Sequence, residues 1–160
     1  MTRNGVARTD GLTIRLAQVS EREALERLQR RSSMHEPMYR AQLAAHPDAI
    51  ELPAEQITAG LVRVAEHNGV IVGFAVLLER SADACELDGL FVEPERMRAG
   101  VGRRLVEDAK RIARERGATR IDVVANPQAV AFYEAVGFIP AGEAQTRFGS
   151  APRMSLPVVY

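Results

Sequence analysis

The stretch ELDGLFVEPERMRAGVGRRL, residues 86–105, decides the fold of this chain. It opens with an apolar run that suits a buried strand, and Pro94, which cannot donate a hydrogen bond to a sheet, ends that strand. Gly100 and Gly102 then allow a tight turn and the close approach of a ligand to bare backbone N–H groups. An amphipathic helix follows, with the positive end of its dipole directed at the turn. Strand, glycine turn and helix N-terminus in this order predict an anion site suited to phosphate.

The residues around these glycines exclude two common phosphate-binding loops. No Gly-Lys-Ser/Thr follows them, as a P-loop requires, and the third glycine of a dinucleotide-binding turn is missing. The run from Val92 to Gly102 instead resembles the acyl-CoA binding motif of the GNAT superfamily of N-acetyltransferases, Val-x-Pro-x-x-(Gln/Arg)-x-x-Gly-x-Gly. Met97 departs from this pattern, because the family usually has Gln or Arg at that position.

A second stretch, from Asn126 to Phe138, is similar to the GNAT pattern Asn-x-x-Ala-x-x-Phe-Tyr-x-x-x-Gly-Phe. Two motifs in this order, a helix and a strand apart, are more specific than either alone. The resemblance covers residues 61–138 and implies an α/β (α+β) protein with the GNAT fold. Such a fold has a mixed, mostly antiparallel sheet of about six to seven strands flanked by about four helices. Residues 85–92 and 119–125 would form its splayed parallel pair.

Periodicity and turn residues predict the remaining elements. The predicted strands are residues 12–17, 61–66, 70–78, 85–92, 119–125, 138–148 and 153–159. The predicted helices are residues 20–31, 38–45, 53–60, 102–116 and 126–136. Ser20 and Glu23 have the spacing of a capping box, and Asn68-Gly69 indicates a hairpin turn. We expect residues 1–11 to be a flexible N-terminus and residues 12–160 to form a single domain.

Charge and cysteine content narrow the class of protein further. The 160 residues include 21 basic and 21 acidic side chains, so the net charge is zero, which argues against nucleic-acid or membrane-surface partners. Cys85 is the only cysteine and the three histidines are scattered, so neither a disulfide nor a metal site is expected. No apolar run could span a bilayer, and the N-terminus lacks the apolar core of a secretory signal. A cytoplasmic protein is therefore expected.

The resemblance implies acetyl-CoA as a co-substrate, without a metal. In the family, the pantetheine amides bond to backbone groups that the splayed strands leave unpaired, and the pyrophosphate lies on the glycine turn. Carried onto this sequence, cofactor contacts are expected from Leu90, Phe91, Val92, Met97, Arg98, Ala99, Gly100, Val101, Gly102, Arg103 and Asn126. Arg96 and Arg104 extend the basic cluster, for which a solvated face is the alternative. A helix cap is the simpler role for Asn126.

Acyl transfer to an amine requires a base, an oxyanion donor and an acid. Tyr133 is the candidate acid for the leaving thiolate, and its alternative role is that of a core aromatic. Glu86 and Asp88, which share one strand face, are the candidate bases. The alternatives are an exposed carboxylate at the strand start and a base that acts through a water chain.

These residues predict an N-acetyltransferase that moves an acetyl group from acetyl-CoA to a primary amine of a small molecule or peptide by direct attack. The alternative is a non-catalytic CoA-binding regulatory module of the same fold. A phosphate binder of another kind is disfavoured by the missing lysine and third glycine. The sequence does not identify the acceptor, although residues 34–39 lie in the segment that usually covers the acceptor site in this family. Because closing strands in this fold often dimerise, a homodimer is also an expectation.

Overall fold

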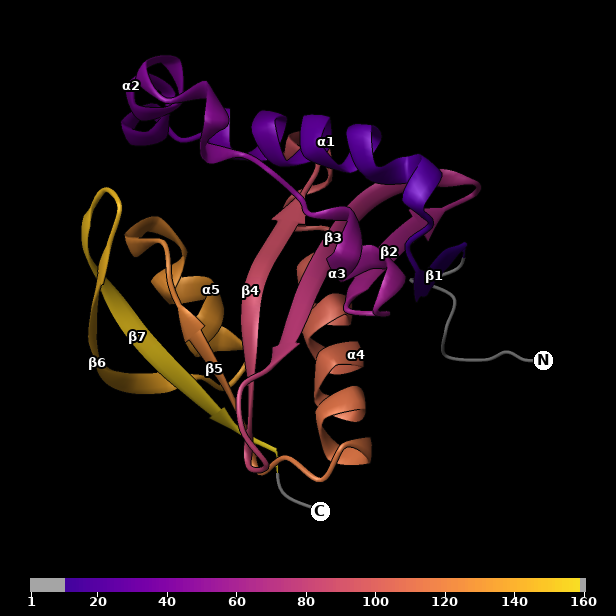
Figure 1. Cartoon of the computed structure of the whole chain (residues 1–160), viewed down its shortest axis with the longest axis vertical. Coiled ribbons are helices and arrows are strands. Elements are labelled where there is room, and N and C mark those ends of the chain that lie inside the picture. Colours follow the sequence, from indigo (N-terminus) through magenta and orange to yellow (C-terminus); the bar gives the residue numbers. More distant parts are fainter. Residues whose placement is uncertain (1–10, 159–160) are drawn as a thin grey trace. The chain divides into compact units, whose positions relative to one another are not determined.

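The computed structural model describes residues 11–158, whose strands form one seven-stranded sheet (Figure 1). The strands are β1 (Leu12–Leu16), β2 (Val62–His67), β3 (Val70–Glu79), β4 (Ala84–Val92), β5 (Arg120–Val124), β6 (Ile139–Thr146) and β7 (Gly149–Pro157). Their hydrogen-bonded order is β1-β2-β3-β4-β5-β7-β6. The β4–β5 pair is parallel, whereas β1–β2, β5–β7 and β6–β7 are antiparallel. This arrangement confirms the predicted mixed sheet with one parallel pair.

The helices lie close to their predicted positions. They are α1 (Arg22–Met34), α2 (Pro37–Ala45), α3 (Ala54–Thr58), α4 (Val101–Glu115) and α5 (Val130–Ala135). Short 3₁₀ turns cover Val19–Glu21, Pro47–Ala49, Pro94–Arg96 and Pro127–Ala129. The predicted hairpin turn at Asn68-Gly69 is confirmed, because both residues have positive φ angles, 51° and 84°. Residues 1–10 of the predicted flexible N-terminus, which was residues 1–11, and the predicted strand end at Val159 lie outside the described residues.

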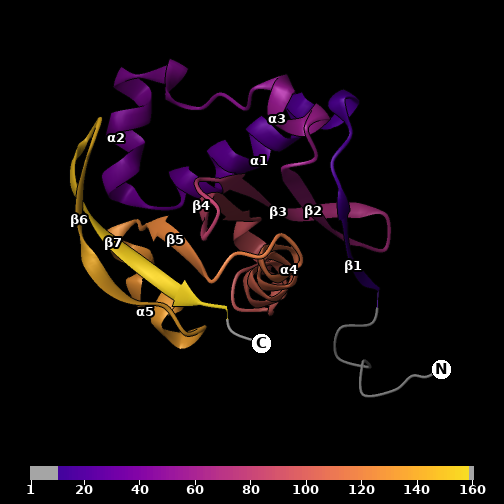
Figure 2. The same ribbon diagram turned by 60° about the horizontal axis from the view of Figure 1, so that its bottom comes forward.

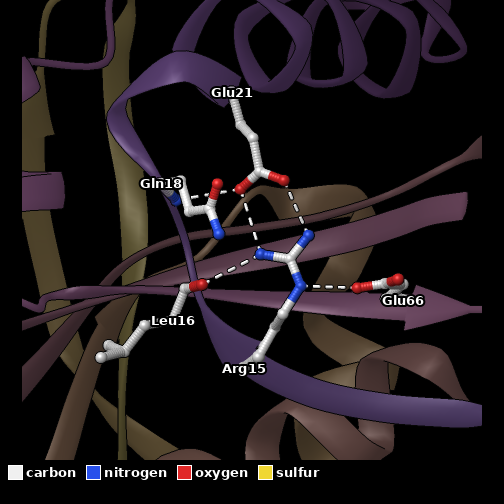
Figure 3. A network of polar contacts seen from close by, with 5 residues as sticks. All are labelled: Arg15, Leu16, Gln18, Glu21 and Glu66. Carbon is white, nitrogen blue, oxygen red and sulfur yellow. Dashed lines mark hydrogen bonds and ion pairs between the residues drawn. The ribbon is translucent and has the colours of Figure 1, made fainter. Parts of the chain in front are cut away.

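The capping box predicted at Ser20 and Glu23 is wrong. The Gln18 N–H donates to Glu21 Oε1 at 2.9 Å, and Gln18, not Ser20, is the N-cap of the 3₁₀ turn Val19–Glu21. Figure 3 shows the reason, which is that Glu21 is held by a cation from the neighbouring strand. Arg15 donates to both Glu21 oxygens at 3.1 and 2.7 Å, and also to Glu66. This bidentate contact also lowers the pKa of Glu21 below its ordinary value.

Two compact units make up the described chain, and β3, β4 and α4 each pass from one to the other. The first unit runs up to Ala75 and includes Leu90–Leu105. It holds the β1–β2 ladder and α1 to α3, and α1 contacts α2. Its fully buried side chains include Leu25, Leu28, Val62, Val64 and Phe74.

The second unit comprises Val76–Gly89 and the chain from Val106 onward. In it, β7 lies between β5 and β6, and β6 and β7 form a hairpin that Figure 2 shows in yellow. Its core side chains include Leu77, Ile121, Phe138 and Met154. Cys85 is also buried, with 2% of its surface exposed, and it pairs with Ile121 across the β4–β5 ladder. By contrast, all but one of the β6 residues are exposed.

Candidate active site

The parallel pairing of β4 with β5 ends before β4 does. The register of β4 with β5 runs from Ala84↔Arg120 to Leu87↔Val123 and stops there, although β4 itself continues to Val92. On its other side β5 remains bound, since Val124 pairs with Arg153 of β7 and the Ala125 N–H donates to the Pro152 carbonyl at 2.8 Å. The second half of β4 therefore has backbone groups without a β5 partner. Such groups require a hydrogen-bonding ligand or water.

The turn after β4 presents a row of free backbone N–H groups. The Met97 and Ala99 N–H groups donate to the carbonyls of Pro94 and Arg96, both at 3.3 Å. Among the described residues, the N–H groups of residues 98 and 100–103 find no backbone acceptor. Arg98 and Gly100 have φ angles of 67° and 90°, which curl the chain so that consecutive N–H groups converge. The arrangement, at the start of the 15-residue helix α4, fits phosphate oxygens.

Gly73 on β3 fixes the position of this turn, a role that no motif in the sequence predicts. A Cβ at Gly73 would lie 2.9 Å from the Phe91 carbonyl oxygen and 3.0 Å from Val101 Cγ1. The first turn of α4 and the end of β4 therefore approach β3 more closely than any side chain permits. The available signal was a single glycine inside the apolar run of residues 70–78.

The arginines predicted to form one basic cluster have different environments. Arg96 Nη1 donates to His67 Nδ1 at 3.3 Å and is thus engaged by β2. Arg98, Arg103 and Arg104 make no ion pair with any described residue, and the first two are exposed. These three remain available to an anionic ligand. Met97 is half-buried in the same turn.

Tyr133 is the buried member of the aromatic pair in α5, with 7% of its surface exposed. Its ring packs edge-on against Phe132 and Phe138, with centroids 5.2 Å away in each case. Within residues 11–158 no group forms a hydrogen bond with its hydroxyl. Burial raises the pKa of Tyr133, so the phenol keeps its proton at neutral pH. The packing is that of a core residue, and the hydroxyl is uncommitted.

The two candidate bases on β4 differ in their partners. Glu86 forms an ion pair with Arg80 from the preceding hairpin, and its side chain is 15% exposed. Asp88 lies two residues further along the same strand face and is exposed to solvent. No described residue forms a hydrogen bond or ion pair with its carboxylate. Desolvation of that carboxyl, together with the charge of Glu86, raises the pKa of Asp88 above its ordinary value.

Asn126 is a cap residue, which is the simpler of the two roles considered for it. Its side chain accepts a hydrogen bond from the Gln128 N–H at 2.8 Å and so caps the 3₁₀ turn that precedes α5. One lone pair of the amide oxygen is used in this way. A contact with a cofactor would have to use the remaining capacity of the amide.

Two kinds of site are not found in residues 11–158. No group of three or more His, Cys, Asp or Glu side chains is placed to hold a metal ion. None of the helices in this part of the chain has the length and apolar character needed to cross a membrane.

The strand, turn and helix described above define a class of protein. Residues 22–138 match the acetyltransferase (GNAT) family, and the chain belongs to that family. It is 36% identical over 85 residues to the 5-NmdU N-acetyltransferase of Pseudomonas phage PaMx11, an alignment that covers 52% of this chain and 61% of that protein. The chain thus spans less than two thirds of this relative.

Solved structures share the fold. The PaiA N-acetyltransferase of Thermoplasma acidophilum, in complex with coenzyme A, has a TM-score of 0.74 at 20% identity, covering 91% of this chain and 98% of that one. Nourseothricin acetyltransferase has a TM-score of 0.56 at 28% identity, covering 61% of this chain and 65% of that one. The expected GNAT fold is confirmed.

Proposed function

We propose that this protein is an N-acetyltransferase that moves an acetyl group from acetyl-CoA to a primary amine by direct attack. The observation that carries the proposal is the row of unbonded N–H groups at residues 98 and 100–103, in a chain that belongs to the GNAT family. A diphosphate needs several converging donors, and backbone groups provide them without ordering long side chains.

The cofactor would be held by two kinds of contact. The turn N–H groups and the free guanidinium groups of Arg98, Arg103 and Arg104 suit the phosphates. The part of β4 without a β5 partner, Leu90 to Val92 above all, suits the amides of the pantetheine arm. When bound, the cofactor supplies an activated acetyl thioester.

Asp88 is the base in this proposal, rather than Glu86. An aliphatic ammonium group has a pKa of about 10.4 and must lose a proton before its nitrogen can attack. Glu86 is held in an ion pair with Arg80, whereas Asp88 has a free carboxylate whose raised pKa suits it to accept a proton. The proton passes from the ammonium group to Asp88, directly or through water.

Tyr133 is the acid. When the amine nitrogen bonds to the thioester carbon, the C=O π electron pair moves to oxygen and gives an oxyanion. When that carbonyl re-forms, the C–S bond breaks and its electron pair stays on sulfur as a thiolate. The phenol of Tyr133, still protonated and without a hydrogen-bond partner in the described chain, supplies the proton that this sulfur requires. The nitrogen, which still carries one proton too many after its attack, releases that proton, and the resulting phenolate takes it up directly or through water, so the products are the neutral amide and the free thiol. A backbone N–H of Leu90 to Val92 is the candidate donor to the intermediate oxyanion.

The acceptor is a primary amine of a small molecule or a peptide. The names of two similar proteins, the 5-NmdU and nourseothricin acetyltransferases, favour small molecules as the first compounds to test. A thiol-release assay with a panel of small amines and peptide N-termini would identify the class. Calorimetric titration with acetyl-CoA tests the cofactor, and absence of binding would contradict the whole proposal.

A non-catalytic CoA-binding module is the alternative function. It predicts acetyl-CoA binding with no thiol release for any amine in the panel. The uncommitted hydroxyl of Tyr133 and the free carboxylate of Asp88 favour the enzyme, because a module that only binds CoA has no use for an acid and a base.

We further propose that residues 12–160 act as a single cytoplasmic domain that forms a homodimer. The support for self-association is that β6 is the last strand of the sheet and is exposed along nearly its whole length. Sedimentation equilibrium would measure the mass, and a monomer at all concentrations would rule out the dimer.

A further inference from the structure

Glu93, between the end of β4 and the phosphate-binding turn, is held by residues from two distant segments. Arg31, in the last turn of α1, donates to both carboxylate oxygens, from Nε to Oε1 at 3.1 Å and from Nη2 to Oε2. The Glu93 N–H donates to the Val72 carbonyl at 2.9 Å. These contacts fix both the backbone and the side chain of Glu93.

The Arg31–Glu93 pair differs from an ordinary surface ion pair. Its carboxylate is 14% exposed, its guanidinium binds in a bidentate manner, and the two residues lie 62 positions apart in sequence. Exposed single contacts contribute little, whereas bidentate contacts to a mostly buried carboxylate restrict geometry. Three residues further along, Arg96 is bound to His67. The 3₁₀ turn Pro94–Arg96 is therefore tied at both ends to other elements.

We propose that Arg31 and Glu93 are positioning residues that hold the phosphate-binding turn in its cofactor-ready conformation. The proposal rests on the function proposed above. The free N–H groups converge only while Arg98 and Gly100 keep their positive φ angles, and Arg98, unlike glycine, does not favour that region. Ordering such a turn upon binding would weaken affinity, so a turn that is already held binds its ligand more tightly.

Hydrogen exchange and calorimetry on Arg31→Gln and Glu93→Gln test this proposal. Both variants should weaken acetyl-CoA binding about threefold to tenfold, and the double variant should lose no more than either single one. Peptides that cover residues 94–103 should exchange faster in both variants without any cofactor. With an acceptor from the amine panel, KM for acetyl-CoA should rise while kcat stays within about twofold.

The two variants separate positioning from simple charge attraction. A through-space effect on phosphate would weaken binding in Arg31→Gln but tighten it in Glu93→Gln, because the latter removes a negative charge. Arg27→Gln is the matched control, since Arg27 lies one helical turn earlier, is exposed and makes no ion pair with a described residue. It should leave binding and exchange unchanged.

Failure of this inference can be told from failure of the proposed function. If the unaltered protein does not bind acetyl-CoA, both are overturned. If it binds acetyl-CoA but Glu93→Gln binds as tightly or more tightly, or the turn exchanges at its original rate, the positioning role alone is overturned.

Discussion

The proposed phosphate-binding turn, residues 94–103, and the proposed acid–base residues Asp88 and Tyr133 would use different parts of the chain for their chemistry. The turn relies on backbone N–H groups, two positive φ angles and the close approach at Gly73. The acid–base pair relies on single functional groups, one free carboxylate and one buried phenol. Side-chain changes in the turn, other than at Arg98 and Arg103, should therefore be tolerated as long as the backbone keeps its path. The acid–base residues, by contrast, should not tolerate loss of one functional group.

The largest effect is expected from Asp88→Asn. Loss of a general base should lower kcat/KM about 10²-fold to 10³-fold, with little change in acetyl-CoA affinity. Activity of the unaltered enzyme should fall as pH drops through the raised pKa of Asp88, because the protonated acid cannot accept a proton. The measurement is a pH–rate profile, and the acid limb should vanish in the variant.

Glu86→Gln is the control for this first prediction. Removal of the Glu86 charge also leaves Arg80 unpaired, and both changes lower the pKa of Asp88. The acid limb should therefore move to lower pH while the rate at high pH stays close to that of the unaltered enzyme. A collapse of the rate at every pH would instead make Glu86 the base.

Tyr133→Phe should have the second largest effect. The ring contacts with Phe132 and Phe138 survive the change, so stability should be kept, while kcat falls roughly tenfold to 100-fold because the thiolate lacks its acid. Steady-state kinetics would compare kcat, and thermal melts would compare stability, between the variant and the unaltered enzyme. An unchanged kcat would reduce Tyr133 to a core aromatic.

Gly73→Ala should show that the turn depends on packing rather than on its own side chains. The added methyl group would meet the Phe91 carbonyl and Val101, so unfolding free energy should fall by about 1–3 kcal/mol and acetyl-CoA should bind more weakly. Denaturant unfolding measures the first effect and calorimetry the second. Val70→Ala, an exposed position on the same strand, should change stability by less than about 0.5 kcal/mol.

Met97→Gln should have the smallest effect. It introduces a usual family residue in a turn whose ligand contacts at this position are proposed to come from the backbone, so acetyl-CoA affinity should change by less than about threefold. Calorimetric titration decides the matter. A gain in affinity of tenfold or more would mean that the side chain at this position contacts the cofactor. The turn would then depend on a side chain, as the acid–base residues do.

The fold could be predicted from sequence because its signals are local. Pro94, the Asn68-Gly69 turn and the amphipathic run of α4 each act over a few residues, and the structure follows them. The two motifs then supplied the strand pairing that no local signal contains. The predicted capping box is wrong because Arg15, from the preceding strand β1, binds the carboxylate of Glu21 in the 3₁₀ turn Val19–Glu21.

The contacts that distinguish the site residues were not predictable in the same way. The Arg31–Glu93 pair spans 62 positions and has no sequence pattern. The Arg80–Glu86 pair has a sequence signal, because Arg80 lies between the predicted strands 70–78 and 85–92 and Glu86 lies near the start of the second. Such residues can meet across a hairpin. That ion pair distinguishes Glu86 from Asp88, whereas the sequence alone makes both carboxylates candidate bases.

Because Cys85 is buried, the rate at which a thiol reagent modifies it would report on local opening of the fold. It is the only thiol in the sequence, and it sits in the paired part of β4 opposite Ile121, shielded from reagents. An aromatic disulfide used to detect released coenzyme A would meet no competing thiol on the folded enzyme. Over longer times the same reagent would label Cys85 only when the parallel pair opens, so its rate would count those openings. A ligand that binds the native state should lower the labelling rate of Cys85, and the decrease should be larger for a tighter ligand. The measurement requires no mutation and no attached dye.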